Sequence, residues 1–295
     1  MKTDRPAARQ LPDISIRQLE YLVAVADHDT WARAAQSVGV SPSALSQGLA
    51  ELERRVGVDL FENQGRRRVL RTAARPVLDH ARQVVSLTAD LVSWSDQLRT
   101  AHLGRVRLGM VDVAALDHYP GVLRSFRDDH AGVELTMSVA PSAELLTDLR
   151  AGVLDLIVCV PPAEWPVGIV ADDLVADPIT VYAPAGTTIG PPATWGPWVL
   201  FPSGSHSRHQ IIEALRALGA PLQVVADSHQ ANVLREMVAL GLGWTALPLA
   251  SEPAGDDLVR GPILFERRLA LARRDGAVTD PAADELADRL VSAPR

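Results

Sequence analysis

Cysteine, lysine and long apolar runs are scarce in this chain of 295 residues. Cys159 is its single cysteine, so no internal disulfide can form, and its apolar neighbours indicate a buried small side chain. The apolar runs are far shorter than the roughly 20 residues that a membrane-spanning helix needs. The first ten residues lack the apolar core of a secretory signal. We therefore expect a cytoplasmic protein with no membrane partner.

Positive charge is also in short supply, because the formal net charge is −7. The deficit is uneven: residues 1–100 hold 14 Lys and Arg against 12 Asp and Glu, whereas residues 101–295 hold 15 against 24. A local basic strip is enough for contact with phosphates, so the acidic total does not exclude a DNA-binding N-terminal part. An apolar content of 47% indicates globular protein, and the length allows two domains.

Residues 30–54 predict two short helices joined by a tight turn. Thr30 is placed to cap the first helix, and Gly39 supplies the left-handed turn after it. Ser41 and Pro42 then form a strong helix start. In the second helix the apolar residues are spaced by four and three, so they share one face and the small polar residues must point away from it. The inward set is Leu45, Leu49, Leu52 and Val56, and the outward set is Ser43, Ser46, Gln47 and Ala50.

A stretch with five arginines and no acid, residues 66–75, follows these helices. Residues 66–70 fit a short hairpin, and a hairpin after two such helices is the layout of a winged helix-turn-helix. An apolar stripe over residues 72–98 then predicts one long helix that tolerates Pro76 in its first turn. Because this helix has no domain of its own to pack on, we expect it to be a dimer-forming connector.

After Gly104 the pattern changes to alternating strands and helices. Strands are expected at residues 105–111, 133–139, 154–160, 179–183, 198–201, 223–226 and 243–248, and helices at 119–130, 143–151, 208–218 and 231–240. Such alternation predicts mostly parallel sheets with helices on both faces, and ligands beyond the C-terminal ends of the strands.

These features resemble the LysR-type transcriptional regulators. The motifs that carry the resemblance are Arg17–Ala26, Arg33–Ala35, Val40–Gln47, Leu52–Glu53, Gly57–Glu62 and Arg71–Ala74. The likeness is dense over residues 14–75 and looser from there to the C-terminus. It implies a multidomain chain in which an all-α winged helix-turn-helix and a linker helix precede an α/β two-lobed effector domain like type 2 periplasmic binding proteins.

The resemblance also implies domain boundaries. A flexible tail is expected over residues 1–13, the DNA-binding domain over 14–73 and the linker helix over 74–102. The effector domain would take residues 103–295, with lobe I at 103–176 and 250–295 and lobe II at 177–249.

The candidate DNA-binding residues come from the helix pattern and the arginine stretch. The N-terminal end of a recognition helix enters the major groove, where Ser contacts several bases and Gln pairs with adenine. Ser43, Ser46 and Gln47 are the candidates for base contacts, beside Ser41, which we expect to act mainly as a cap. Each phosphate neutralised by a cation steepens the salt dependence of binding. The candidates for phosphate contacts are Thr30, Arg33, Arg66, Arg67, Arg68 and Arg71.

The effector pocket is implied by the resemblance. Its residues are expected in loops that follow strands and at helix N-termini, and helix N-termini attract anions. The candidates are Asp112, Val113, Ala114, Ser142, Ser203, Gly204, Ser205, His206, Ser228 and His229. Each of them could equally be an ordinary polar loop residue.

Several positions depart from the family pattern. Arg71 and Arg75 replace a Leu and a Gly that are usual after the wing, and both add positive charge. Gly48 stands inside the recognition helix where the family usually has a larger apolar residue, at a cost of about 1 kcal/mol of helix stability. Many family members carry a hydroxyl after the first strand of the effector domain, whereas residues 110–115 carry Asp112 and no hydroxyl. This favours an amine-bearing, neutral or aromatic effector over a simple carboxylate.

Metal and enzyme functions are less well supported. His206 and His209 lie three residues apart, but no Cys or carboxylate stands at a fixed spacing from them, so no metal is predicted. The segment 203–206 lacks the nucleophile elbow of hydrolases, and Ser beside His in sequence does not define a catalytic triad. We therefore expect neither an enzyme nor a cofactor.

The expected partners are a double-stranded DNA operator, a small-molecule effector, and further copies of the chain in a dimer or tetramer through the linker helix. RNA polymerase is a further candidate partner. The alternative is a solute-binding or protein-interaction module without DNA function. Salt-dependent binding to generic duplex DNA would separate the two readings.

Overall fold

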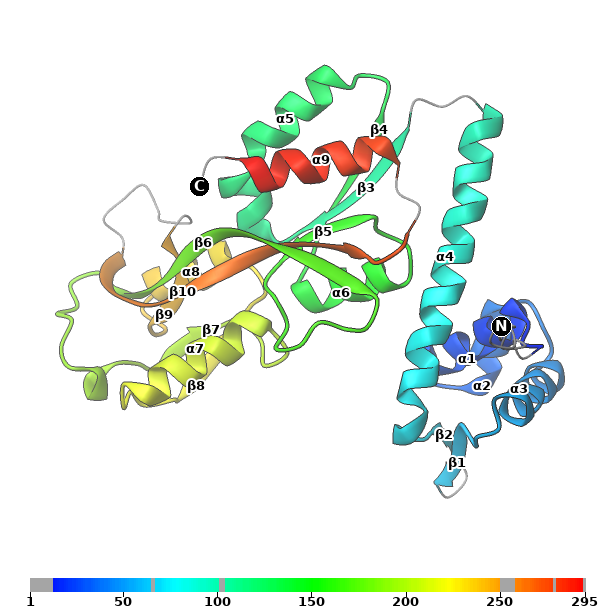
Figure 1. The fold of residues 1–295 in the computed structure, drawn as a ribbon. Helices are drawn as coiled ribbons and strands as arrows, with labels where there is room; N and C mark the ends of the chain where they lie inside the picture. Colours follow the sequence, from blue (N-terminus) through cyan, green and yellow to red (C-terminus); the bar gives the residue numbers. More distant parts are fainter. Residues whose placement is uncertain (1–12, 65–66, 101–103, 250–257, 278–279, 294–295) are drawn as a thin grey trace, which may run out of the picture. The chain divides into compact units, whose positions relative to one another are not determined.

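The computed structural model describes residues 13–64, 67–100, 104–249, 258–277 and 280–293. The chain forms two compact units, Met1–Ala89 and Asp90–Arg295, and the boundary lies inside the long helix α4 (Arg75–Thr100) (Figure 1). Each unit has an apolar core of its own. In the described part of the chain no helix is both long and apolar enough to cross a membrane.

The first unit is a helix-turn-helix followed by a hairpin, as the sequence predicts. Its elements are α1 (Ile16–Asp27), α2 (Trp31–Ser37), α3 (Pro42–Val56), β1 (Phe61–Gln64), β2 (Arg67–Leu70), a 3-10 turn (Thr72–Ala74) and the start of α4. The Thr30 hydroxyl accepts a hydrogen bond from Arg33 N and caps α2, and the Ser41 hydroxyl caps α3. The hairpin is longer than expected because β1, which begins at Phe61, was not predicted as a strand.

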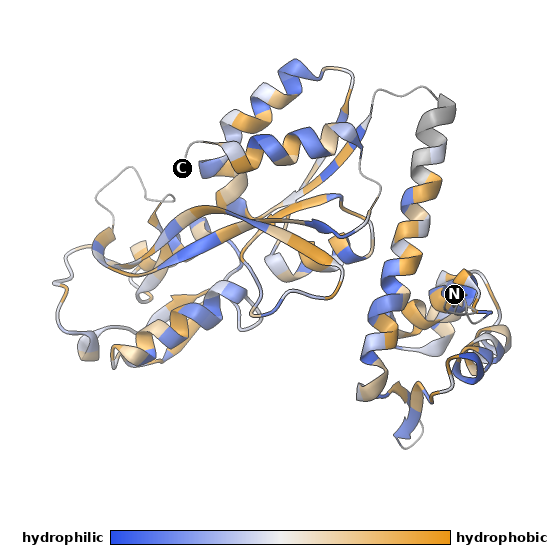
Figure 2. Cartoon of the chain, viewed as in Figure 1, coloured by the Kyte–Doolittle hydropathy of each residue, from blue (hydrophilic) through white to orange (hydrophobic). Residues whose placement is uncertain are grey.

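The long helix starts one turn later than expected and has a partly buried first stretch. Leu78 and Ala81 belong to the core of the first unit, so the expectation that this helix has no domain to pack on is wrong for its first turns. Further along, Val84 and Leu87 are 39% and 36% exposed. Figure 2 shows hydrophobic and hydrophilic residues alternating along α4.

The second unit is built on a six-stranded mixed sheet in the order β4-β3-β5-β10-β6-β9. The strands are β3 (Arg105–Met110), β4 (Glu134–Val139), β5 (Leu156–Cys159), β6 (Ile169–Pro184), β9 (Thr245–Pro248) and β10 (Leu258–Arg274). β3 pairs in parallel with β4 and β5, but the pairings of β10 with β5, β10 with β6 and β6 with β9 are antiparallel. The expectation of mostly parallel sheets is therefore wrong. A separate parallel pair joins β7 (Trp198–Leu200) to β8 (Val224–Asp227).

The antiparallel pairings come from two long strands, β6 and β10, that run through both lobes. The apolar core of lobe I takes Leu174 from β6 and Leu271 from β10, and the core of lobe II takes Ile179 and Val181 from β6. The first half of β6 and all of β10 were missing from the predicted strands. β4 lies at the edge of the sheet, where its Met137 is 51% exposed.

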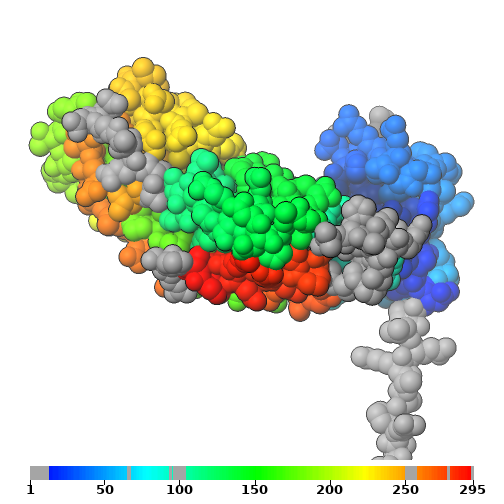
Figure 3. Space-filling model, turned by 90° about the horizontal axis from the view of Figure 1, so that it is seen from above, coloured from blue at the N-terminus to red at the C-terminus, as the bar shows by residue number. Residues whose placement is uncertain are grey.

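Helices cover this sheet and lie beside its strand ends. They are α5 (Pro120–Asp129), α6 (Ser142–Arg150), α7 (His206–Ala217), α8 (Ala231–Ala239) and α9 (Pro281–Ser292), with a π-helical turn (Ala114–His118) before α5 and a 3-10 turn (Pro192–Thr194) before β7. The sequence predicted α5 to α8 but not α9. Arg289 of α9 binds Asp129 of α5 at 2.7 Å, and Figure 3 shows α9 (red) beside the green residues of lobe I.

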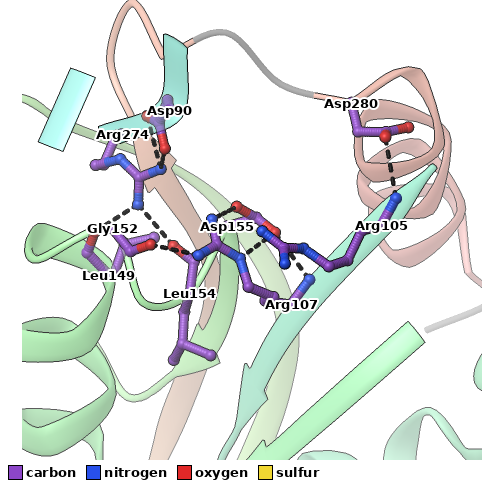
Figure 4. A network of polar contacts seen from close by, with 9 residues as sticks. All are labelled: Asp90, Arg105, Arg107, Leu149, Gly152, Leu154, Asp155, Arg274 and Asp280. Atoms are coloured by element: carbon purple, nitrogen blue, oxygen red, sulfur yellow. Dashed lines mark hydrogen bonds and ion pairs between the residues drawn. The ribbon is translucent and has the colours of Figure 1, made fainter. Parts of the chain in front are cut away.

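A network of arginines surrounds the end of α6 and joins it to Asp90 of α4 (Figure 4). The buried Arg274 donates from Nη1 to the carbonyls of Leu149 and Leu154 at 2.7 and 2.6 Å, and from Nη2 to the Asp90 carboxylate. Arg107 donates to the Gly152 carbonyl at 2.6 Å. Cations thus add hydrogen bonds to carbonyls at the end of the helix and in the turn after it, where positive charge is favoured.

Candidate functional site

The outward face of α3 is small and polar, as predicted. Leu45, Leu49 and Leu52 are fully buried, whereas Ser43 and Gln47 are exposed and Ser46 is half-buried. The Ser41 hydroxyl accepts from Ala44 N at 3.2 Å and lies 2.9 Å from the Ser43 hydroxyl. Ser41 is therefore engaged as the cap, which leaves Ser43 and Gln47 as the side chains open to solvent at this end.

Gly48 is explained by close packing between α1 and α3. A Cβ at this position would lie 2.7 Å from the ring of Tyr21, much closer than carbon atoms normally approach. The Tyr21 hydroxyl accepts a hydrogen bond from Arg17 Nε at 3.3 Å, and Tyr21 is only 9% exposed. The glycine thus lets the tyrosine ring lie against α3, and the sequence alone does not indicate this contact.

Arg68 lies inside the first unit as a structural cation. Its Nη2 donates to Glu53 Oε2 at 2.7 Å, and its guanidinium lies 5.2 and 5.0 Å from the ring centroids of Trp31 and Phe61. The other oxygen of Glu53 accepts from Leu60 N at 2.9 Å. This cluster holds the hairpin against α3, so Arg68 is less available to a phosphate than the sequence suggests.

The other predicted phosphate contacts differ in exposure. The Arg33 side chain is 71% exposed and 3.7 Å from Asp29, and the Arg71 side chain is 43% exposed and 3.5 Å from Asp59. The side chains of Arg66 and Arg67 lie outside the described residues. Arg33 and Arg71 are the predicted cations with weakly paired, solvent-facing guanidinium groups.

The second unit contains a cavity of about 580 Å³ between strand ends and helix N-termini. The predicted residues that line it are Asp112, Ser142, Gly204, Ser205, His206 and His229. Of the other predicted residues, Val113 and Ala114 are buried in the core of lobe I and Ser203 is exposed. The Ser228 hydroxyl accepts from Gln230 N at 3.2 Å and so shapes the approach to α8.

The sequence did not identify Glu144, Ser207 and Arg267 as lining residues. Glu144 and Ser207 lie in the first turns of α6 and α7. The rule that ligands bind near helix N-termini after strands could therefore have identified both. Arg267 is on β10, which no sequence pattern predicted.

Arg267 is part of a buried ionic cluster in the cavity wall. Its Nη2 binds the Asp177 carboxylate, its Nη1 donates to the Ser207 hydroxyl at 3.0 Å, and His118 Nε2 lies 3.6 Å from Asp177 Oδ1. Burial alone would raise the pKa of Asp177, but the neighbouring His118 and the charge and hydrogen bond of Arg267 outweigh it and hold that pKa below its usual value.

Two further polar contacts position the lining residues around Val160. The Val160 carbonyl accepts from His206 Nδ1 at 2.9 Å, and its N–H donates to the Ser142 hydroxyl at 3.1 Å. Within the described residues no three His, Cys, Asp or Glu side chains come together to hold a metal ion. Cys159 is fully buried, and burial raises the pKa of its thiol to about 12.

Two family models match this arrangement. Residues 16–74 match the bacterial regulatory helix-turn-helix proteins of the lysR family, and residues 99–295 match the LysR substrate binding domain. The chain belongs to the LysR family. Both the resemblance and the fold class expected from the sequence are confirmed, and the chain is a DNA-binding transcriptional regulator with an effector-binding domain.

Similar proteins cover nearly the whole length of this LysR-family chain. The "Probable hydrogen peroxide-inducible genes activator" of Streptomyces viridosporus is 30% identical over 297 residues, which are 95% of each chain. The regulator IlvR of Caulobacter vibrioides is 26% identical, over 90% of this chain and 95% of its own.

Solved structures show the same fold. A full-length OxyR variant from Pseudomonas aeruginosa has a TM-score of 0.59 and 22% identity, covering 95% of this chain and 99% of its own. Full-length CbnR, solved in complex with its target DNA, has a TM-score of 0.55 and 18% identity, covering 94% of this chain and 98% of its own.

Proposed function

We propose that this regulator reads its operator with the N-terminal end of α3 and responds to a small molecule held in the cavity of the second unit. Ser43, Ser46 and Gln47 would meet base edges in the major groove, and Arg33 and Arg71 would contact phosphates. In this proposal residues 14–73 form the DNA-binding domain, residues 74–102 form the linker helix and residues 103–295 form the effector-binding domain.

The observation that carries the DNA-reading proposal is the division of α3 into two faces. Its leucines are fully buried in the core of the first unit, so the exposed Gln47 is fixed in direction by a rigid helix. The cap at Ser41 fixes the start of that helix as well. A polar side chain on a rigid element is what base recognition requires, since each good bidentate contact gives about 1–3 kcal/mol of discrimination.

The test is the sequence preference of the Gln47→Ala variant. Preferred duplexes would be selected from a random DNA library by the full-length protein and by the variant, and their affinities compared by fluorescence anisotropy. We expect the preference to change at a few positions while affinity for generic duplex stays the same. Gln223→Ala, at an exposed position of the second unit, is the matched control. An unchanged preference in Gln47→Ala would show that this residue does not read bases.

The effector would act by shifting a population of conformations. Two lobes share the long strands β6 and β10, and the cavity is lined by residues from both lobes. A ligand changes DNA binding only if it binds two arrangements of the protein with different affinity. We also propose self-association through α4, with RNA polymerase as a further partner.

A peroxide-sensing thiol is not part of this proposal, although one relative is named as a hydrogen peroxide-inducible genes activator. Cys159 is the single cysteine of the chain, and burial raises the pKa of its thiol to about 12. Oxidation requires an accessible thiolate. The matched relatives are named as regulators, and we likewise propose no enzymatic activity.

A further inference from the structure

Among the described residues that line the cavity, Arg267 is the single arginine, and it does not provide a free positive charge. Arg267 is 4% exposed and is paired with Asp177, which has no exposed surface, so the two formal charges cancel inside the wall. Ser207 accepts a further hydrogen bond from the same guanidinium. What Arg267 still offers is its Nε–H, which is buried and has no acceptor among the described residues.

Negative charge on the wall is, by contrast, unpaired. Asp112 follows β3 and Glu144 follows β4, two neighbouring parallel strands whose ends meet at one edge of the sheet. Asp112 Oδ1 accepts from Val113 N at 2.8 Å, and neither carboxylate has an ion-pair partner within the described part of the chain. This side of the cavity therefore favours an ammonium group.

The other side of the cavity presents the N-termini of α7 and α8. These helices follow β7 and β8, which are also parallel neighbours, and neither Ser205 nor Gln230 caps its helix with a side chain. The first N–H groups of a helix need acceptors and favour negative charge. Ser207, in the first turn of α7, is bonded to Arg267 Nη1, so an anion at this helix end would lie beside the guanidinium.

We propose that the effector is a zwitterion, a free amino acid or a short peptide, with its ammonium group at Asp112 and Glu144 and its carboxylate at the α7 N-terminus beside Arg267. The proposal rests on the cavity being the effector site. A cavity of about 580 Å³ is large enough for an amino acid with a bulky side chain or a dipeptide. A ligand with only one charged group would leave either the two carboxylates or the α7 N-terminus without a partner of opposite charge.

The test compares matched sets of compounds on the full-length protein. One set is L-phenylalanine, 3-phenylpropanoate and 2-phenylethylamine, a second is L-leucine, 4-methylpentanoate and isopentylamine, and the remaining amino acids and their dipeptides complete the screen. Thermal shift and calorimetry would measure binding. We expect at least one zwitterion to bind, with its analogues that lack either charge at least about tenfold weaker, because each leaves charged or polar groups of the site unpaired. If no zwitterion binds, or if a carboxylate alone binds as tightly, the proposal is wrong.

A variant locates the ammonium group. Asp112→Asn should weaken binding of the zwitterion by about tenfold, because a charge-assisted hydrogen bond is lost. The affinity for the analogue without the amine should not change. Asp128→Asn on the exposed surface of α5 is the control. Equal weakening of both compounds by Asp112→Asn would contradict the assignment of the ammonium group.

DNA binding separates this proposal from the proposed function. If the zwitterion binds and the affinity for the selected duplex does not change, the ligand class stands and the effector role fails. If an uncharged or singly charged compound binds in its place and changes that affinity, the effector role stands and the zwitterion is excluded.

Discussion

Helix N-termini are closed by the chain's own side chains in the first unit, whereas those around the cavity of the second unit are left open. Ser15, Thr30 and Ser41 accept hydrogen bonds from the first turns of α1, α2 and α3. α6, α7 and α8 start at the cavity without any such side chain. In the second unit Asp280 does cap α9, which does not line the cavity. α5, which does not line the cavity either, also starts without a side-chain cap, so open helix starts in the second unit are not confined to the cavity.

The two units also differ in where their charged side chains lie. Among the described residues, the charged side chains that are buried, Asp90, Asp177, Arg267 and Arg274, all belong to the second unit. The first unit keeps its charges at the surface or half-buried, as in the pair of Arg68 with Glu53. The first unit is thus stabilised by apolar packing and local caps, and the second also depends on buried ion pairs.

The largest effect is expected from Asp177→Asn. Removing one member of a buried ion pair leaves the other charge uncompensated, at a cost of about 3–5 kcal/mol. Urea unfolding of the full-length protein at neutral pH measures it. Asp173→Asn is the matched control, because Asp173 is on the same strand and its pair with Arg268 is 62% and 60% exposed. Such an exposed pair contributes little, and equal losses in the two variants would contradict the special role of the buried pair.

The pH dependence of the same variant has a defined sign. The pKa of Asp177 is lowered in the folded protein, so its stabilisation is fully present above the ordinary carboxyl pKa and is lost as the pH falls through the lowered value. The difference in unfolding free energy between the wild type and Asp177→Asn should therefore narrow in acid. A difference that grows as the pH falls would show that Asp177 is not the stabilised carboxylate.

A smaller loss is expected from Gly48→Ala in the first unit. Alanine favours a helix by about 1 kcal/mol over glycine, but its Cβ would lie 2.7 Å from the Tyr21 ring. Overpacking of this kind costs about 1–3 kcal/mol, so we expect a net loss of stability in urea unfolding. Gly121→Ala in α5 is the control, since its Cβ would meet nothing within 4 Å. If Gly48→Ala were as stable as the wild type, the tyrosine contact would not be the reason for the glycine.

The caps themselves give the direct test of the comparison. Ser41→Ala removes a side chain that accepts from Ala44 N and should cost about 1 kcal/mol. Ser205→Ala, at the start of α7, removes no such bond and should leave the unfolding free energy unchanged without ligand. Thermal unfolding of both variants measures this. Equal costs at the two positions would remove the distinction between closed and open helix starts.

These differences also explain how much the sequence could predict. The caps at Thr30 and Ser41 and the leucine spacing of α3 act between near neighbours, so both the first unit and the polar face of α3 were predictable. β6 and β10 were not, because Asp173, Arg267 and similar charges interrupt any apolar pattern. The ion pair of Asp177 with Arg267 joins residues 90 positions apart. No local pattern indicates such a contact, and the cavity wall that depends on it was only partly predicted.

The smallest effect distinguishes two arginines that the sequence treated alike. Arg33 is 71% exposed, whereas Arg68 is held by Glu53 and two aromatic rings. Arg33→Ala should reduce the slope of log affinity against log salt concentration by about 1 without changing stability. Arg68→Ala should lower stability and leave that slope unchanged below its unfolding temperature. Anisotropy titrations of generic duplex DNA over a range of salt concentrations measure both slopes. A reduced slope for Arg68→Ala would mean that the Arg68 guanidinium leaves Glu53 and contacts a phosphate when DNA binds. The first unit would then also contain a group that becomes available only to its ligand, the DNA.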